Sequence, residues 1–341
     1  MHQIIVRVRI IACINHLRKT ANKDYKITNK DHKRIKSTFE RGVGNKMKNS
    51  LKNGFYTALG TPVDAYGNLV ESSMEKHVKD QVEYNASGLL VMGSMGLEPY
   101  IKQSEYSKVA KVAAEAAKGK CTVFIGAMDN SVARVEERIK TLEGLKIDGV
   151  VLTTPFYMVT SQEELKSYFT KIASISPFPV YLYDLPGVTK IKTNADTVEY
   201  LMDNDNIKGI KTGDLVTARV LTRSEKKRDN FSILFSGLDI FDVAYRYGIK
   251  MNLDGMFSCT HPIADKMYSL MEQGDYCGGA AYLDKIVALR NLFIKVGVMR
   301  GFSYAMNLMG YEGYFCPDYT IEGNEEEFAC IKEFLMENGL I

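Results

Sequence analysis

The stretch NIKGIKTGDLVTARVLTRSEKK, residues 206–227, holds the pattern that decides the fold. Its first part, IKGIKTG, is a short apolar run that predicts a strand, and its second part has the spacing of a helix. Successive side chains of a strand point to opposite faces, so Lys208 and Lys211 cannot both point into the same space. The stretch therefore predicts one strand–helix unit with a lysine near each end of its strand.

The same unit occurs eight times along the chain. The eight apolar runs are GFYTALGTPV (54–63), GLLVMG (88–93), CTVFIGA (121–127), DGVVLTTP (148–155), FPVYLYDLP (178–186), IKGIKTG (207–213), FSILFSG (231–237) and LDGMFSC (253–259). Continuous apolar runs are typical of strands that are buried on both faces, and strand–helix repetition indicates parallel strands. Eight such units predict a (β/α)8 TIM barrel, a fold of typically about 250 residues.

A doubly wound open sheet is the structural alternative. A glycine-rich phosphate loop should then follow the first strand, but ALGTPVD (58–64) lacks the GxGxxG spacing, which favours the barrel. We expect the barrel domain to span residues 47–274. Residues 275–341 are expected to form a C-terminal helical extension of two or three helices without a strand.

Residues 1–46 form a basic N-terminal extension, with 12 basic and three acidic residues against 32 and 38 in the rest of the chain. One interpretation is a transit peptide, because the first 20 residues are rich in arginine and poor in acid. A second is a basic arm that binds nucleic acid. The third, which we favour, is a start codon assigned too early, because a strand follows within a few residues of Met47. The segment is otherwise expected to be disordered.

Composition excludes several classes of function for the remaining chain. No apolar stretch approaches the roughly 18 residues that span a bilayer, and the mildly acidic body gives no reason to expect nucleic acid as a partner. The cysteines show no CxxC spacing and no Cys/His cluster, so we expect reduced thiols, no metal and a cytoplasmic location. The six are Cys13, Cys121, Cys259, Cys277, Cys316 and Cys330.

Candidate catalytic residues follow from the rule that such a barrel has its active site at the carboxyl ends of its strands. Lys208 begins its strand, whereas Lys211 ends the same strand and is expected at the mouth. An amine there can condense with a ketone to an iminium, which takes up electrons when the neighbouring carbon–carbon bond breaks. The structural alternative is an ion pair between Lys211 and a carboxylate such as Asp214.

Three other strand ends carry hydroxyl groups. Tyr183 can exchange protons with a substrate hydroxyl, or it is a core aromatic residue whose own hydroxyl is satisfied. Tyr157 follows its strand just beyond Pro155. Ser94 lies between two glycines, where backbone N–H groups can hold a carboxylate, or where the chain simply turns from strand to helix.

From about residue 50 onward the sequence resembles the dihydrodipicolinate synthase / N-acetylneuraminate lyase family. This is a family of pyruvate-handling class I aldolases on a (β/α)8 barrel. The motifs that carry the resemblance occur in the family's order. They are GSMG (93–96), TPFY (154–157), YDLP (183–186), GIK (209–211), SGLD (236–239) and GMFS (255–258).

The resemblance implies a role for each matched residue. Lys211 would form a Schiff base with pyruvate or another 2-keto acid, and Tyr183 would donate and accept protons. Ser94 and Tyr157 would complete a hydroxyl relay, with Tyr157 contributed across a dimer interface. No metal and no organic cofactor are implied, and the assembly would be a homotetramer built from two tight dimers. The implied substrate-binding residues are Gly93, Met95, Gly96, Phe257 and Ser258.

Several positions depart from the family pattern. Met95 replaces a threonine that helps to hold the pyruvate carboxylate, and Glu98 comes one place after the usual glutamate position. Asp184 replaces an asparagine, and Val188 stands where a synthase-type member has a carboxylate-binding arginine. The segment KTGD (211–214) is about two residues shorter than usual, so the loop after the lysine must differ.

These observations predict a Schiff-base lyase or aldolase that cleaves or forms a 2-keto acid. Ser94 and the missing arginine favour a sugar acid substrate, as in N-acetylneuraminate lyase or a 2-keto-3-deoxy sugar acid aldolase. The enzymatic alternative is 4-hydroxy-tetrahydrodipicolinate synthase, which uses pyruvate and aspartate semialdehyde. The alternative from another class is a barrel that binds a keto acid without turning it over, for which the altered turn around Met95 is the support.

Overall fold

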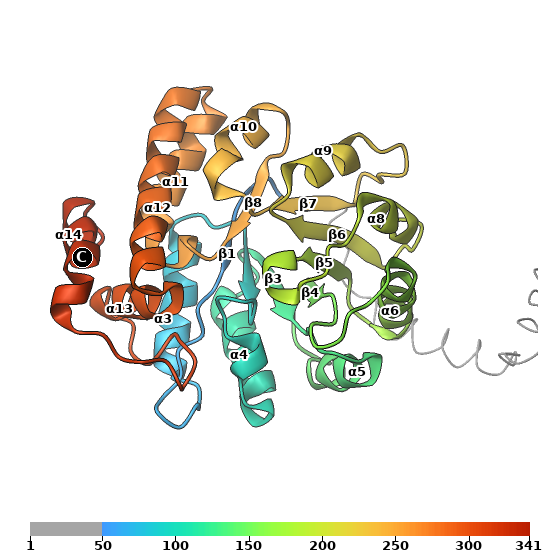
Figure 1. Cartoon of the computed structure of the whole chain (residues 1–341), viewed down its shortest axis with the longest axis horizontal. Coiled ribbons are helices and arrows are strands. Elements are labelled where there is room, and N and C mark those ends of the chain that lie inside the picture. The colour runs from blue at the N-terminus through green and yellow to red at the C-terminus, as the bar shows by residue number, and fades with distance from the viewer. Residues whose placement is uncertain (1–49) are drawn as a thin grey trace, which may run out of the picture. The chain divides into compact units, whose positions relative to one another are not determined.

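The computed structural model describes residues 50–341, and the predictions made for residues 1–46 lie outside this part of the chain. Eight parallel strands close into a barrel in chain order, with β1 pairing both β2 and β8 (Figure 1). The prediction of a (β/α)8 barrel is confirmed. The strands are β1 Gly54–Ala58, β2 Gly88–Val91, β3 Thr122–Gly126, β4 Gly149–Thr153, β5 Val180–Asp184, β6 Ile207–Thr212, β7 Ser232–Phe235 and β8 Met251–Asp254.

Helices surround the barrel and connect its strands (Figure 1). Those that follow the first four strands are α3 Glu71–Glu83, α4 Gln103–Ala117, α5 Val132–Thr141 and α6 Gln162–Ile175. Those that follow the last four are α7 Pro186–Thr189, α8 Ala195–Leu201, α9 Leu215–Arg223, α10 Phe241–Arg246 and α11 Phe257–Glu272, with short 3-10 helices η1 Glu98–Tyr100 and η2 Leu238–Ile240.

The continuous apolar runs form strands because both faces of each strand are buried. One set of side chains fills the barrel, where the rings of Phe124 and Tyr181 lie 4.5 Å apart between centroids. The other set packs outward against the helices, as Phe55 does against Phe257 at 5.5 Å. Alternation along each strand thus assigns its residues either to the barrel interior or to the helix layer.

The position predicted for the eighth strand is wrong in its second half. The prediction covered residues 253–259, whereas β8 ends at Asp254 and α11 already begins at Phe257. Gly255 and Met256 separate the two elements, and the polar residue Asn252, which precedes the predicted run, lies within the strand and is fully buried. The apolar side chains after Gly255 belong to a buried helix, which an apolar run alone does not distinguish from a buried strand.

Three helices follow the last barrel unit, as expected for the end of the chain. They are α12 Tyr276–Val296, α13 Val298–Leu308 and α14 Glu325–Glu337. Figure 1 shows them on the side of the barrel that carries α3 and α11. Phe302 of α13 contacts the barrel, because a Cβ added at Gly60 would lie 2.7 Å from its ring. No helix in residues 50–341 is long and apolar enough to cross a membrane.

Candidate active site

Lys211 and Tyr183 lie side by side at the carboxyl ends of β6 and β5. The strand register pairs them directly. Their exposed fractions are 6% and 4%, and the Nζ atom of Lys211 lies 3.8 Å from the centre of the Tyr183 ring. No hydrogen bond within residues 50–341 engages the Tyr183 hydroxyl, so the structure does not support the alternative of a core tyrosine with a satisfied hydroxyl.

The structure does not support an ion pair between Lys211 and Asp214 either. The Asp214 carboxylate lies 3.0 Å from the Nζ of Lys192 and caps α9 through the backbone N–H of Val216 at 2.8 Å. Within the described residues no ion pair involves Lys211. Its amine therefore stands at the barrel mouth without a bound carboxylate.

The other lysine of the strand has a different environment. Lys208 lies at the amino end of β6 and is partly buried. Burial, followed by the positive charge of Arg228, lowers the pKa of Lys208. Because the barrel mouth is at the opposite end of the strand, Lys208 is separated from the site that contains Lys211 and Tyr183.

Ser94 and Met95 lie on the turn that follows β2, and both are partly exposed. Within the described residues no hydrogen bond uses their backbone N–H groups, which leaves these donors available for a carboxylate. Gly96 allows the turn to lie close to the barrel, because a Cβ there would be 2.8 Å from the carbonyl oxygen of Leu59. No hydrogen bond joins the Ser94 hydroxyl to Tyr183 in the described part.

The two departures on this turn have distinct structural consequences. The Met95 side chain packs over the turn after β8, since a Cβ added at Gly255 would lie 2.1 Å from its Cγ atom. The displaced glutamate, Glu98, is buried and paired with Arg138 of α5. Burial raises the pKa of Glu98 to about 8, although the positive charge of Arg138 acts in the opposite direction. Glu98 thus anchors the turn to the helix layer.

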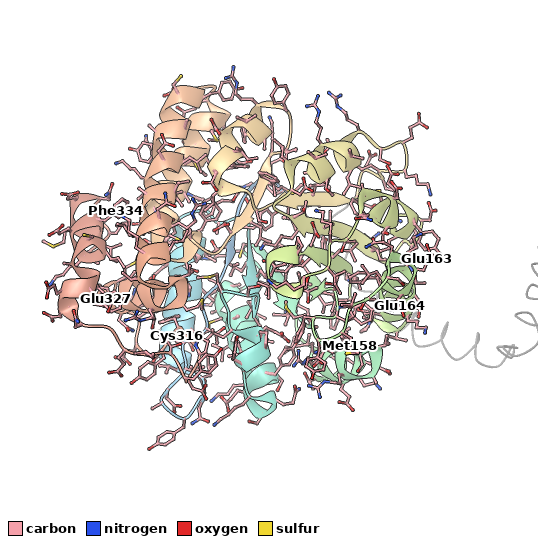
Figure 2. All side chains as sticks on the ribbon, viewed as in Figure 1. Met158, Glu163, Glu164, Cys316, Glu327 and Phe334 are labelled. Atoms are coloured by element: carbon pink, nitrogen blue, oxygen red, sulfur yellow. The ribbon has the colours of Figure 1, made fainter. Side chains whose placement is uncertain are left out.

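Tyr157 lies on the loop between β4 and α6 and is 84% exposed. The loop is held by Asn130, whose Oδ1 atom accepts hydrogen bonds from the N–H groups of Phe156 and Tyr157 at 2.8 and 2.9 Å. The next residue, Met158, is also exposed and is labelled in Figure 2. Within one chain, therefore, Tyr157 does not form a hydroxyl relay with Tyr183.

Phe257 and Ser258 lie at the start of α11 with fully buried side chains. The Ser258 hydroxyl donates a hydrogen bond to the Ala58 carbonyl at 3.2 Å, which joins α11 to β1. The Nε2 atom of Gln81 donates to the carbonyls of Phe257 and Ser258 at 3.1 and 3.3 Å. These contacts are structural, and the substrate-binding role of both residues stays a prediction.

Sequence reasoning missed two polar residues at strand ends. Thr153 pairs in register with Tyr183, and its buried hydroxyl has no hydrogen-bond partner among the described residues. Asp254 ends β8. Burial raises the pKa of its carboxyl, although the hydrogen bond from the Met256 N–H and the positive charge of Lys211 act to lower it. The rule that chemistry lies at strand ends could have found both.

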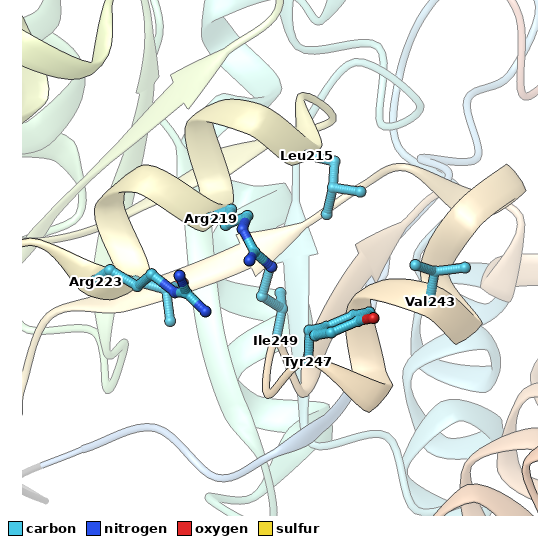
Figure 3. A pocket seen from close by; sticks show the side chains of 7 residues that line it. Leu215, Arg219, Arg223, Val243, Tyr247 and Ile249 are labelled. Carbon is cyan, nitrogen blue, oxygen red and sulfur yellow. The ribbon is translucent and has the colours of Figure 1, made fainter.

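A separate hollow of about 300 Å³ lies on the outside of the barrel between α9 and α10 (Figure 3). Lys211 and Tyr183 do not line it, so it is distinct from the barrel mouth. Its lining residues are Leu215, Arg219, Thr222, Arg223, Val243, Tyr247 and Ile249.

Comparison with known proteins agrees with this geometry. The model of the Dihydrodipicolinate synthetase family matches residues 51–320. The 4-hydroxy-tetrahydrodipicolinate synthase of Rhodopseudomonas palustris is 29% identical over 75% of this chain and 86% of that protein. The protein of the same name from Afipia carboxidovorans is 27% identical over 84% of this chain and 97% of its own length. Both names agree with the enzymatic alternative better than with a sugar acid lyase.

Solved structures show the same fold. Dihydrodipicolinate synthase from Thermotoga maritima superimposes with a TM-score of 0.78 at 23% identity, covering 85% of this chain and all of that one. A prophage protein of the dihydrodipicolinic acid synthase family from E. coli K12, solved with pyruvate, has a TM-score of 0.78 at 20% identity, with 86% and 100% coverage. Because the family model matches residues 51–320, the chain belongs to the dihydrodipicolinate synthetase family of pyruvate-dependent class I aldolases and is a carbon–carbon lyase.

Proposed function

We propose that the chain forms or cleaves the bond between C3, the carbon next to the keto carbon of pyruvate or a related 2-keto acid, and C4, through an imine on Lys211. The observation that supports this most is the buried Lys211 amine, 3.8 Å from the Tyr183 ring and without an ion-pair partner in the described residues. The amine attacks the keto carbon and water leaves. The resulting iminium nitrogen accepts the electron pair of the breaking bond, so neither a metal nor an organic cofactor is required.

The neighbouring residues supply the remaining parts of this mechanism. The Tyr183 hydroxyl moves protons to and from the reacting oxygen atoms, with Ser94 and a partner subunit's Tyr157 completing the relay. The free N–H groups of Ser94 and Met95 hold the carboxylate of the keto acid. Gly93 and Gly96 allow the tight turn that presents these N–H groups.

Aspartate semialdehyde is the first aldehyde to test as the partner of pyruvate. It is supported by the relatives, which are named 4-hydroxy-tetrahydrodipicolinate synthase. A sugar acid is the second candidate because Val188, at the position of the carboxylate-binding arginine, is 64% exposed and has no charge with which to hold a second carboxylate. Two assays separate these substrate candidates. One measures condensation of pyruvate with aspartate semialdehyde, and the other measures pyruvate release from N-acetylneuraminate and 2-keto-3-deoxy sugar acids.

The proposed assembly is a homotetramer made of two tight dimers, of which the mechanism requires the tight dimer if Tyr157 acts on a partner's site. The loop that carries Tyr157 offers a run of exposed apolar side chains for such a contact, from Phe156 to Val159. Apolar side chains that are contiguous and exposed are typical of interaction surfaces. A cytoplasmic location remains part of the proposal.

Borohydride reduction in the presence of pyruvate, followed by peptide mass spectrometry, tests the proposed function. We expect one adduct, on Lys211, which is absent from Lys211→Ala and retained by Lys208→Ala, the matched control on the same strand. An adduct on a different lysine would refute the assignment. Thermal stabilisation by pyruvate without any adduct would instead support the barrel that binds a keto acid without turnover.

A further inference from the structure

A cluster of charged and hydroxyl side chains lies directly behind Lys211 and Tyr183. Asp184 and Thr212 are the next register pair of β5 and β6. Because strand side chains alternate, this pair faces the helix layer while Lys211 and Tyr183 face the barrel mouth. The Thr212 hydroxyl donates a hydrogen bond to the Asp184 carboxylate at 2.9 Å, which links the ends of the two strands.

The Asp184 carboxylate is buried, and both of its oxygen atoms are engaged. Oδ1 accepts a hydrogen bond from the backbone N–H of Thr193 at 3.0 Å. Oδ2 accepts from Thr212 and pairs with the ammonium group of Lys192. A buried carboxylate is costly unless it is fully paired, so the position of Asp184 depends on these three donors.

Lys192 connects this carboxylate to a second one. Its Nζ atom lies 3.0 Å from Asp214, the residue that caps α9. Partial burial acts to raise the pKa of Asp214, but hydrogen bonds from Lys192 and Thr217 lower it to about 2. One ammonium group thus joins the end of β5, the start of α9 and the segment before α8.

We infer that Asp184 and Lys192 are positioning residues for the reaction at Lys211. Their ion pair, with the hydrogen bond from Thr212, fixes the ends of β5 and β6 in the register that holds the Lys211 amine against the Tyr183 ring. Lys192 also engages the Asp214 carboxylate, so that this group is not available to the Lys211 amine. The family pattern that the sequence resembles has asparagine at position 184, and an asparagine there would have no charge with which to pair with Lys192. The inference rests on the proposed role of Lys211.

The rate of pyruvate imine formation measures this positioning directly. It is followed as cyanoborohydride trapping in the full-length wild type, Asp184→Asn, Lys192→Met and the double variant. We expect each single variant to trap about tenfold more slowly, because small displacements of reacting groups slow reactions strongly. The double variant should be no slower than the slower single variant, because both changes remove one shared interaction. Lys192→Arg, which keeps the charge, should restore most of the rate.

Arg228→Met is the matched control. Arg228 pairs with Asp205 at 2.9 Å and donates to the Ile207 carbonyl at the opposite end of β6. We expect this variant to lose thermal stability but to trap pyruvate at the wild-type rate. If the Asp184 and Lys192 variants behave in the same way, with trapping within twofold of wild type, the cluster only stabilises the fold and the inference is overturned.

Two further results are informative. If Lys192→Met does not fold, Thr212→Val removes only the hydroxyl that links the two strand ends. Slower trapping by this variant supports the inference, and an unchanged rate overturns it. If the wild type itself gives no adduct, the proposed function has failed and the inference fails with it. A loss of trapping that is confined to the variants leaves the proposed function intact, so the two failures are distinguishable.

Discussion

The Lys211 amine lies over the ring of Tyr183, 3.8 Å from its centre, although the two residues come from different strands. The contact therefore involves the ring, and the hydroxyl group remains free for proton transfer. Tyr183→Phe keeps the ring and removes only the hydroxyl. We expect borohydride trapping on Lys211 to persist while steady-state turnover falls by about 10²- to 10⁴-fold, the usual contribution of a positioned acid or base. Turnover at the wild-type rate would assign the proton to another group.

Tyr157 is expected to act on the site of a partner subunit, because its side chain is exposed in a single chain. Lys211→Ala and Tyr157→Phe should each be nearly inactive. When they are co-expressed, a mixed dimer contains one complete site, and random pairing restores about a quarter of the wild-type activity. Native mass spectrometry establishes that mixed dimers form. Mixed dimers without activity would place the function of Tyr157 within its own chain.

Gly96→Ala is expected to destabilise the turn that carries Ser94 and Met95. The new Cβ would lie 2.8 Å from backbone atoms of Leu59 and Met92, which cannot move aside as a flexible side chain can. We expect a loss of about 1–3 kcal/mol in the free energy of unfolding, measured in urea, and weaker pyruvate binding.

Gly187→Ala is the control for this substitution, because nothing lies within 4 Å of a Cβ at that position. Its free energy of unfolding should stay close to that of the wild type. An equal loss in both variants would show that the turn has no special requirement for glycine at position 96.

Two buried histidines predict a loss of stability in acid. Burial lowers the pKa of His77 to about 3 and that of His261 to about 4. An unfolded histidine takes up its proton near pH 6.5, so the stabilisation from the neutral rings is complete above that pH and is lost as the pH falls towards 4 and then 3. Each histidine should contribute a slope of about 1.4 kcal/mol per pH unit in that range.

Urea unfolding at pH 7.5 and pH 5 measures this dependence. His77→Phe, which keeps an aromatic ring beside Tyr311 and Phe315, should show a smaller loss between the two pH values than the wild type. The same loss in both proteins would mean that His77 does not remain neutral when the protein is folded.

The contact between Lys211 and Tyr183 follows from sequence reasoning because, in a parallel barrel, position along a strand determines depth. Apolar runs locate the strands, and the residues that end neighbouring strands must then meet at the mouth. The same reasoning misplaced the eighth strand, where apolar residues after Gly255 continue into a helix. Periodicity does not separate a buried strand from the first turn of a buried helix.

The ion pair between Asp184 and Lys192 could not be predicted in this way. Its formation depends on how residues 190–194 return to the barrel, after a turn in which Lys190 has a φ of 61°. That path is set by tertiary packing, for which the sequence carries no periodic signal. The role predicted for Tyr157 comes from the family resemblance, because no pattern within one chain places this exposed residue at the site.

The short connection after Lys211 limits how this enzyme can be re-engineered. A single residue, Gly213, separates the end of β6 from the cap of α9. An insertion there would detach Asp214 from the helix that it caps and from Lys192, so the segment is a poor place to graft new specificity. The longer β4–α6 loop over residues 154–161 has no such attachment through Lys192. Libraries that aim to broaden the range of accepted aldehydes should therefore diversify residues 158–160 of that loop, keep Tyr157, and leave residues 211–214 unchanged.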